Sequence, residues 1–285
     1  MKVSVPAAVL ALCAAAAALL LLAPAEASHH LKLGYYKETC PGVEKIVKYH
    51  VAKAIKANRG DGAALVRLIF HDCFVRRDLP DSTFTIAELI RNFRRKNFTV
   101  EELVILSGAH AVGVGHCSSF RARLSSPPAQ IVPAYRNLLS AKCAAGPDPV
   151  VPNNVRDEDP RVVAASFPSF LKKLRKAKDF LDNSYYHNNL ARIVTFNSDW
   201  QLLTEKEALG HVKEYAENGT LWDEDFSDAL VKLSKLPMPP HSKGEIRKTC
   251  RWVVAGREQS SYLQPADSSS NSLTTCKQHL HSTEN

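Results

Sequence analysis

Apolar residues that recur every three or four positions between residues 41 and 75 constrain the fold more than any other feature of the chain. In the first half of this stretch they stand at Val43, Ile46, Val47, Val51, Ala54 and Ile55. Because side chains at this spacing share one face of a helix, the pattern predicts an amphipathic first helix. Asp61 and Gly62 interrupt the pattern, and a second helix is expected to continue to about Val75.

The next stretch continues the helical pattern. A short amphipathic helix is predicted over residues 86–93. Thr99 and Glu102 form a T-x-x-E capping box before the apolar run 103–106, which predicts another helix start. His110 is then expected near the C-terminal end of that helix.

The second half of the chain is also expected to be helical, so the protein is predicted to be mostly α. Helices are predicted over residues 180–203 and 226–236, and an ordered turn over 242–254. Residues 125–161 are rich in Pro, Ala and Asn and are predicted to form a loop. The sequence contains neither internal repeats nor a clear strand alternation.

The N-terminus is typical of a secretory signal peptide. Met1 and Lys2 precede an apolar run over residues 3–22, and Ala25-Glu26-Ala27 is a cleavage site of the A-x-A kind. The run is long enough for a membrane anchor as the alternative, but the small residues at its exit favour cleavage before Ser28. We therefore expect a signal peptide over residues 1–27 and no membrane association after its removal.

The folded domain is expected over residues 28–254. Residues 255–285 are expected to form a disordered tail, because residues 259–285 are polar and rich in Ser and Thr.

The formal net charge of +8 would let an exported protein adhere to acidic wall polymers, although a generic solvated surface explains most of the charges equally well. The Lys and Arg residues are scattered, which argues against nucleic acid, and we expect a monomer.

The cysteine count also fits an exported protein. Of seven cysteines, Cys13 lies in the signal peptide and six remain, an even number that suggests disulfides. Their spacing contains no C-x-x-C pair of the kind that binds zinc. Glycosylation sequons begin at Asn97 and Asn218.

Two histidines stand in strings that suggest chemistry. Arg67 and His71 are four residues apart, so a helix places them side by side on one face, with Phe70 adjacent. This pairing suits the polarisation and cleavage of a small polar substrate. His110 lies in Leu-Ser-Gly-Ala-His-Ala-Val-Gly. Either histidine alone would be interpreted as an ordinary half-buried residue.

Together the two strings resemble the haem-flanking signatures of secretory plant peroxidases, the class III haem peroxidases. Further stretches resemble other motifs of that family, namely residues 33–36, 39–41, 79–80, 181–186, 197–199 and 244–251. The resemblance implies two helical lobes around haem b, with hydrogen peroxide and small phenolic donors as substrates. It also implies export to the cell wall space, with the vacuole as the second possible destination.

The resemblance assigns roles to residues on the side of the haem that holds the iron ligand. His110 would ligate the iron through a neutral imidazole nitrogen, and Asp199 would accept the other ring N–H. The alternative for Asp199 is a helix cap or a surface acid. Phe70 would contact the cofactor from the opposite, distal side.

The distal side carries the acid–base chemistry in the resemblance. His71 would take a proton from hydrogen peroxide and return it to the leaving oxygen, while Arg67 would stabilise the developing negative charge. The Pro80 carbonyl would orient the aromatic donor, and Pro80 would also break a helix.

The family pattern is interrupted directly after the distal motif. His71 and Pro80 are nine positions apart, whereas the family places much of its distal lobe between them. We therefore expect an internal deletion near residues 75–78 and a truncated distal lobe. In the family, this missing block contains three cysteines. It also contains the residues that form hydrogen bonds with the distal histidine.

The resemblance also has consequences for disulfides and for calcium. Cys117 and Cys143 keep each other as partners, whereas Cys40, Cys73 and Cys250 lose theirs. Asp72 and the Val75 carbonyl remain from the distal calcium site, but Ca²⁺ needs roughly six to eight oxygen ligands, so this site is expected to be lost.

Proximal calcium binding is expected to be weak or absent as well. Asp182 survives as a ligand, but Ala111 stands where the family has a threonine ligand, and the segment before Asp182 is unlike the usual ligand loop.

Three functional hypotheses follow. The first is an exported peroxidase with impaired distal architecture. The second is a truncated, non-enzymatic product of a peroxidase gene. The third, a histidine-based metallohydrolase, rests on the histidine count alone, because no H-E-x-x-H string is present.

Overall fold

The computed structural model describes residues 32–74, 79–159, 161 and 179–236, apart from the side chains of Asp72 and Cys73. Contacts divide the chain into residues 1–35 and 36–285, and almost all described residues belong to the second unit. Several expectations fall outside the described residues. They concern the signal peptide, the tail, the turn over 242–254, the junction near 75–78, and the residues Asp72, Cys73, Val75 and Cys250.

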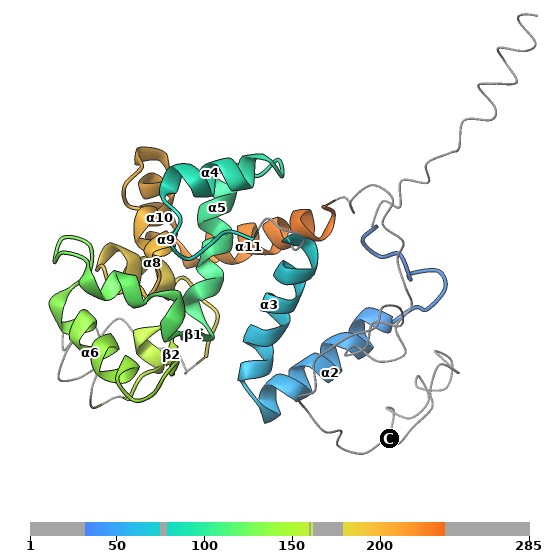
Figure 1. Ribbon diagram of the computed structural model, residues 1–285. Coiled ribbons are helices and arrows are strands. Elements are labelled where there is room, and N and C mark those ends of the chain that lie inside the picture. Colours follow the sequence, from blue (N-terminus) through green and yellow to red (C-terminus); the bar gives the residue numbers. More distant parts are fainter. Residues whose placement is uncertain (1–31, 75–78, 160, 162–178, 237–285) are drawn as a thin grey trace, which may run out of the picture. The chain divides into compact units, whose positions relative to one another are not determined.

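The described chain is mostly helical, as predicted (Figure 1). The first two helices are α2 (Val43–Ala57) and α3 (Gly60–Phe74), and they match the predicted amphipathic pair. The next two are α4 (Ile86–Arg94) and α5 (Val100–Ser107), followed by a 3-10 turn, η1 (Gly108–Ala111).

Both helices α4 and α5 begin with a capping box. In α5 the Thr99 hydroxyl accepts the Glu102 N–H, and the Glu102 carboxylate accepts the Thr99 N–H. Thr85 and Glu88 form the same pair at the start of α4. These local contacts satisfy N–H groups that have no partner inside the helix, which is why the sequence signature located the start of α5.

The prediction of a loop over residues 125–161 is wrong. This stretch contains α6 (Pro133–Cys143), β2 (Val150–Pro152) and the 3-10 turn η4 (Val155–Asp157). Strand β2 pairs antiparallel with β1 (Val114–His116), with Gly115 opposite Val151. Pro133 is tolerated because it occupies the first turn of α6, where its missing N–H has no helical partner to lose.

The predicted helix over residues 180–203 is also wrong as a single element. It consists of α8 (Ser184–Leu190) and α9 (Asn197–Gln201), separated by a turn in which Arg192 has a positive φ of 58°. A left-handed residue ends a helix, and no glycine marks this position in the sequence.

The last helices are longer than predicted. Helix α10 (Lys206–Glu217) was not predicted, and α11 (Gly219–Ser234) begins before the predicted range 226–236. The Asn218 side chain accepts the Leu221 N–H and so caps α11. Asn218 and Asn97, the two sequon asparagines, are both exposed.

Two hydrophobic cores hold these elements. In the first, α5 packs against α10 and α11, and α8 packs against α10, around Tyr186, Tyr215 and Trp222. The second core lies between α6 and the two-stranded sheet and includes the disulfide between Cys117 and Cys143.

The helices α2 and α3 are much less buried than the rest. Helix α2 has no buried residue. Leu65 and Leu68 on α3 are 41% and 55% exposed, and Val47 on α2 is 55% exposed. Helix α3 is anchored mainly through its second half, where Phe74 packs against Phe93 and where Val66 and Phe70 also contact the first core. Apart from Phe74, the described apolar side chains of these two helices are therefore half-buried at most.

Candidate functional site

His110 lies in the η1 turn that follows α5. A side chain at Gly108 would come within 2.7 Å of Trp222 and of the Tyr186 hydroxyl, so only glycine permits this close approach. Gly113 has a φ of 86°, which favours glycine, and turns the chain into β1. Glycines on both sides of His110 thus shape the turn that presents it.

The His110 ring is paired with a buried carboxylate. Its Nδ1 lies 2.8 Å from Asp199 Oδ1, as the resemblance predicted. The imidazole is 42% exposed, whereas the Asp199 side chain is 4% exposed. Among the described residues, no hydrogen bond involves His110 Nε2.

Three donors converge on the Asp199 carboxylate. Oδ1 accepts the Tyr185 hydroxyl at 3.0 Å in addition to His110, and Oδ2 accepts the Phe196 N–H at 3.2 Å. Asp199 therefore also caps the start of α9, and both suggested roles apply to this residue. The alternative of a surface acid is wrong, because Asp199 is buried.

Opposing effects act on the His110 pKa. Burial lowers this pKa, but the negative charge of Asp199 and its hydrogen bond raise it, and the net result is above the ordinary value of 6.5. The rings of Phe196 and Tyr185 lie edge-on to the imidazole, with centroids 5.1 and 6.2 Å away.

These features fit an iron ligand. With the ring proton on Nδ1 facing the carboxylate, Nε2 is the nitrogen that could bind a metal, and it belongs to a half-exposed ring.

The second histidine lies on α3. Arg67 Nε donates to His71 Nε2 at 3.3 Å, so the two side chains do share one face, as their spacing predicted. Arg67 is exposed. Phe70, the expected cofactor contact, stacks on Phe74 with ring centroids 4.5 Å apart and packs against the first core.

The segment around Pro80 is tied to the Asp199 helix. The Ser198 N–H donates to the Ser82 carbonyl, and Asn197 Nδ2 donates to the Thr83 carbonyl. Pro80 is partly buried and lies before α4 without belonging to a helix. Helix α9 therefore holds both Asp199 and the segment that carries Pro80.

The predicted disulfide between Cys117 and Cys143 is confirmed. Cys40 is also disulfide-bonded. Its partner is not among the other described side chains, since Cys117 and Cys143 bond to each other. Cys40 is therefore not a free thiol.

Asp182, the expected proximal calcium ligand, does not face an open cation site. Its two carboxylate oxygens each accept a hydrogen bond of 3.1 Å from Arg156 Nη1. The same guanidinium also donates to the Ala111 carbonyl at 3.3 Å. These residues do not fit calcium, because a protein cation lies among the oxygens. Sequence reasoning did not identify Arg156.

The sequence of the chain is similar to those of known peroxidases. A family model described as peroxidase matches residues 75–218, a range that contains His110 and Asp199 and begins just after His71. Peroxidase 2 of Zea mays is 29% identical over 333 residues, covering 84% of this chain and 95% of the relative. Peroxidase 47 of Arabidopsis thaliana is 24% identical over 309 residues, covering 78% and 89%. Both alignments are longer than this chain of 285 residues, so they contain gaps within it.

Proposed function

The chain belongs to the peroxidase family, and from this premise we propose that it is an exported plant haem peroxidase whose distal side is impaired. The reaction is the oxidation of small phenolic donors by hydrogen peroxide. The observation that carries the proposal is the pair formed by His110 and the buried Asp199. Haem b supplies, when bound, an iron that reacts with hydrogen peroxide and accepts electrons from donors.

His110 would hold the iron through Nε2. Asp199 keeps the ring proton on Nδ1 and makes the imidazole a stronger electron donor. Tyr185 and the Phe196 N–H hold the carboxylate in place, so the orientation of the imidazole is set before any cofactor binds. This preorganisation supports haem binding by the part of the chain that contains His110 and Asp199, here called the proximal half.

The distal pair would handle the proton of hydrogen peroxide. His71 Nε2 accepts this proton and returns it to the leaving oxygen, while the Arg67 guanidinium stabilises negative charge on the separating oxygens. However, Arg67 already donates to His71 Nε2, the atom that has to act as the base. Proton transfer therefore requires this hydrogen bond to break first.

The incomplete burial of the apolar side chains of α2 and α3 supports a deletion in the distal lobe. Family relatives align over more positions than this chain contains, and His71 is followed by Pro80 after only nine positions. A missing block near residues 75–78 would explain why Leu65 and Leu68 remain exposed. Without it, the acid–base residues lose the neighbours that fix their orientation, which lowers their efficiency.

Other features of the chain bear on the donor substrate and on the compartment to which the protein is exported. The Pro80 carbonyl would receive the hydroxyl of the phenolic donor. The signal peptide over residues 1–27 would direct export to the cell wall space or, alternatively, the vacuole, and the net charge of +8 suits acidic wall polymers. No helix in the described part of the chain is long and apolar enough to cross a membrane. We expect a monomer.

The second candidate is a non-enzymatic remnant of a peroxidase. The exposure of α2, which buries none of its residues, favours this candidate, because a loosely packed distal half would leave the haem open to water. The family match leaves the metallohydrolase hypothesis without support.

Haem titration of the purified full chain, followed by guaiacol oxidation, separates the candidates. A Soret band that is absent in His110→Ala, together with measurable turnover, supports the impaired peroxidase. A Soret band without turnover supports the remnant, and no specific haem binding would contradict the proposed function.

A further inference from the structure

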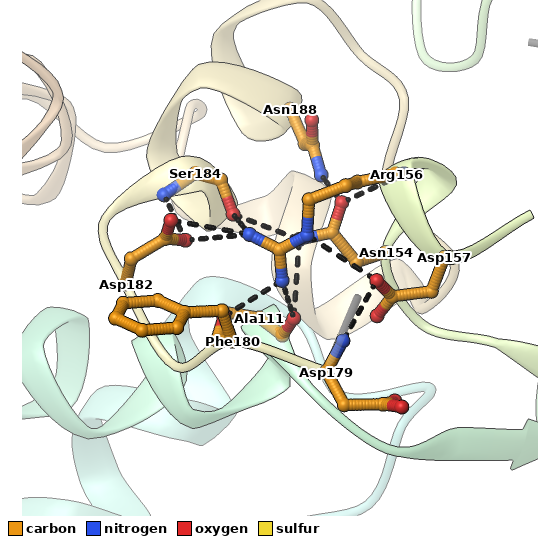
Figure 2. Close-up of polar contacts among 9 residues, drawn as sticks. All are labelled: Ala111, Asn154, Arg156, Asp157, Asp179, Phe180, Asp182, Ser184 and Asn188. Carbon is orange, nitrogen blue, oxygen red and sulfur yellow. Dashed lines mark hydrogen bonds and ion pairs between the residues drawn. The ribbon is translucent and has the colours of Figure 1, made fainter. Parts of the chain in front are cut away.

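A cage of oxygen atoms surrounds the side chain of Arg156 (Figure 2). Nη2 donates to the carbonyls of Phe180 and Ala111 at 2.7 and 3.3 Å. Nη1 donates to both Asp182 oxygens at 3.1 Å and to the Ser184 hydroxyl at 3.3 Å. Nε donates to Asp157 Oδ1 at 3.2 Å.

The cage is buried and acidic. The side chains of Arg156, Asp157 and Asp182 are 4%, 1% and 6% exposed. Two carboxylates therefore share one guanidinium charge away from water, where an unpaired charge would be strongly unfavourable. Asp157 Oδ2 is buried and accepts no hydrogen bond from the described residues. Arg156 therefore does not donate a hydrogen bond to every carboxylate oxygen of the cage.

Carboxylates, backbone carbonyls and a hydroxyl are also the ligands that Ca²⁺ prefers. Asp182 was expected to be a calcium ligand, and Ala111 occupies the position of another. In this structure the oxygens of both residues accept hydrogen bonds from the guanidinium instead. The planar fork of arginine can serve several oxygens at once, which a single ammonium group cannot do with the same geometry.

We propose that the guanidinium of Arg156 takes the place of a divalent cation in this cage, so that the proximal half of the molecule is held together without calcium. The cation is part of the chain and cannot dissociate. This arrangement removes the dependence of this region on metal supply.

The cage connects the segments that position His110. Ala111 follows His110 directly, and its carbonyl accepts from both Arg156 and Asn154 Nδ2. Ser184 begins α8, and the next residue, Tyr185, donates to Asp199. Arg156 therefore links the backbone beside His110 to helix α8, whose Tyr185 contacts Asp199, the partner of His110.

Calcium binding to the haem-free full chain tests the proposal, and the readout does not depend on peroxidase activity. Isothermal titration with Ca²⁺ should show no binding at this cage in the wild-type chain, and EDTA should leave its melting temperature unchanged. In Arg156→Ala the emptied cage keeps its two carboxylates. This variant should melt at a lower temperature and regain several degrees when Ca²⁺ is added.

Two further variants make the result decisive. Arg156→Lys keeps one positive charge but loses the fork, so it should also be destabilised while binding Ca²⁺ more weakly than Arg156→Ala. Arg91→Ala, an exposed arginine on α4, should behave like the wild-type chain in all assays. Calcium binding at the cage of the wild-type chain, or a marked fall in its melting temperature with EDTA, would overturn the proposal. That conclusion would hold even if Arg156→Ala failed to fold.

Discussion

His110 Nδ1 and Asp199 Oδ1 meet at 2.8 Å although the two residues are 89 positions apart in the chain. The turn η1 presents the histidine and α9 presents the carboxylate, so the pair exists only when the proximal half is folded. Tyr185 donates to the same carboxylate oxygen and competes with His110 for its negative charge. The strength of the His110 hydrogen bond is therefore adjusted by a third residue.

This competition predicts opposite effects of two substitutions on the haem-loaded protein. Asp199→Asn removes the negative charge, makes His110 a weaker electron donor and should raise the ferric/ferrous potential. Tyr185→Phe removes a donor from the carboxylate, strengthens its bond to His110 and should lower the potential. Spectroelectrochemical titration of both variants tests this, and shifts of the same sign would contradict the assigned hydrogen-bond network.

The raised pKa of His110 predicts how the stability of the haem-free chain depends on pH. A group whose pKa is higher in the folded than in the unfolded state contributes stability that is fully present below the unfolded pKa. The contribution of His110 is therefore present below its ordinary pKa of 6.5 and is lost as pH rises through the folded pKa.

Asp199→Asn removes the charge that raises the His110 pKa, so the variant should lose less stability over this pH range than the wild-type chain. Urea unfolding at several pH values from mildly acidic to mildly alkaline measures the difference. An equal pH dependence in both proteins would show that the pair does not stabilise the fold.

The close approach of Gly108 to Trp222 predicts a packing defect. Gly108→Ala places a methyl group where Trp222 and the Tyr186 hydroxyl lie only 2.7 Å away, so the variant should be destabilised by about 1–3 kcal/mol. Gly210→Ala is the matched control, because nothing lies within 4 Å of its new methyl group on the exposed side of α10. This control should be stabilised by about 0.5–1 kcal/mol, the usual advantage of alanine in a helix.

Chemical denaturation of the two glycine variants side by side provides the measurement. A Gly108→Ala protein as stable as the wild type would mean that Trp222 can move away from the turn without cost.

The elements that sequence reasoning located are those specified by local contacts. The capping box of Thr99 and Glu102 lies within four residues, and the periodic pattern of α2 and α3 is equally local. Helix α6 was missed because the prolines and asparagines of the surrounding residues 125–161 are typical of loops. Its buried Tyr135, Leu139 and Cys143 are stabilised by the second core, which local sequence does not show.

The same distinction between local and long-range contacts applies to the candidate site. The spacing of Arg67 and His71 was sufficient to place them on one face, because a helix relates them directly. The pairing of His110 with Asp199 came from the family resemblance and not from spacing. The role of Arg156 was missed because its acceptors come from separate segments that only the folded chain brings together.

The cysteines allow a direct chemical test. Peptide mapping under non-reducing conditions should recover Cys117 linked to Cys143, and Cys40 in a second disulfide. Replacing both Cys117 and Cys143 by Ala should cost about 2–4 kcal/mol, because their bond closes a loop in the unfolded chain. Recovery of Cys40 as a free thiol would contradict the bonded state of this residue.

The pair of His110 and Asp199 is held in place by its neighbours, whereas the pair of Arg67 and His71 is not arranged for proton transfer. Arg67 is exposed and donates a hydrogen bond to His71 Nε2, the nitrogen that would act as the base in the proposed reaction. This geometry is not that of a prepared acid–base pair. A misaligned pair of this kind typically slows proton transfer by about 10²-fold or more.

Stopped-flow mixing of the haem-loaded chain with hydrogen peroxide, monitored at the Soret band, measures this step directly. We predict a rate about 10²-fold or more below that of a full-length plant peroxidase, with little further loss in His71→Ala. A rate equal to that of the full-length enzyme, lost in His71→Ala, would show that Arg67 and His71 form a working acid–base pair in this chain and that the proposed impairment is wrong.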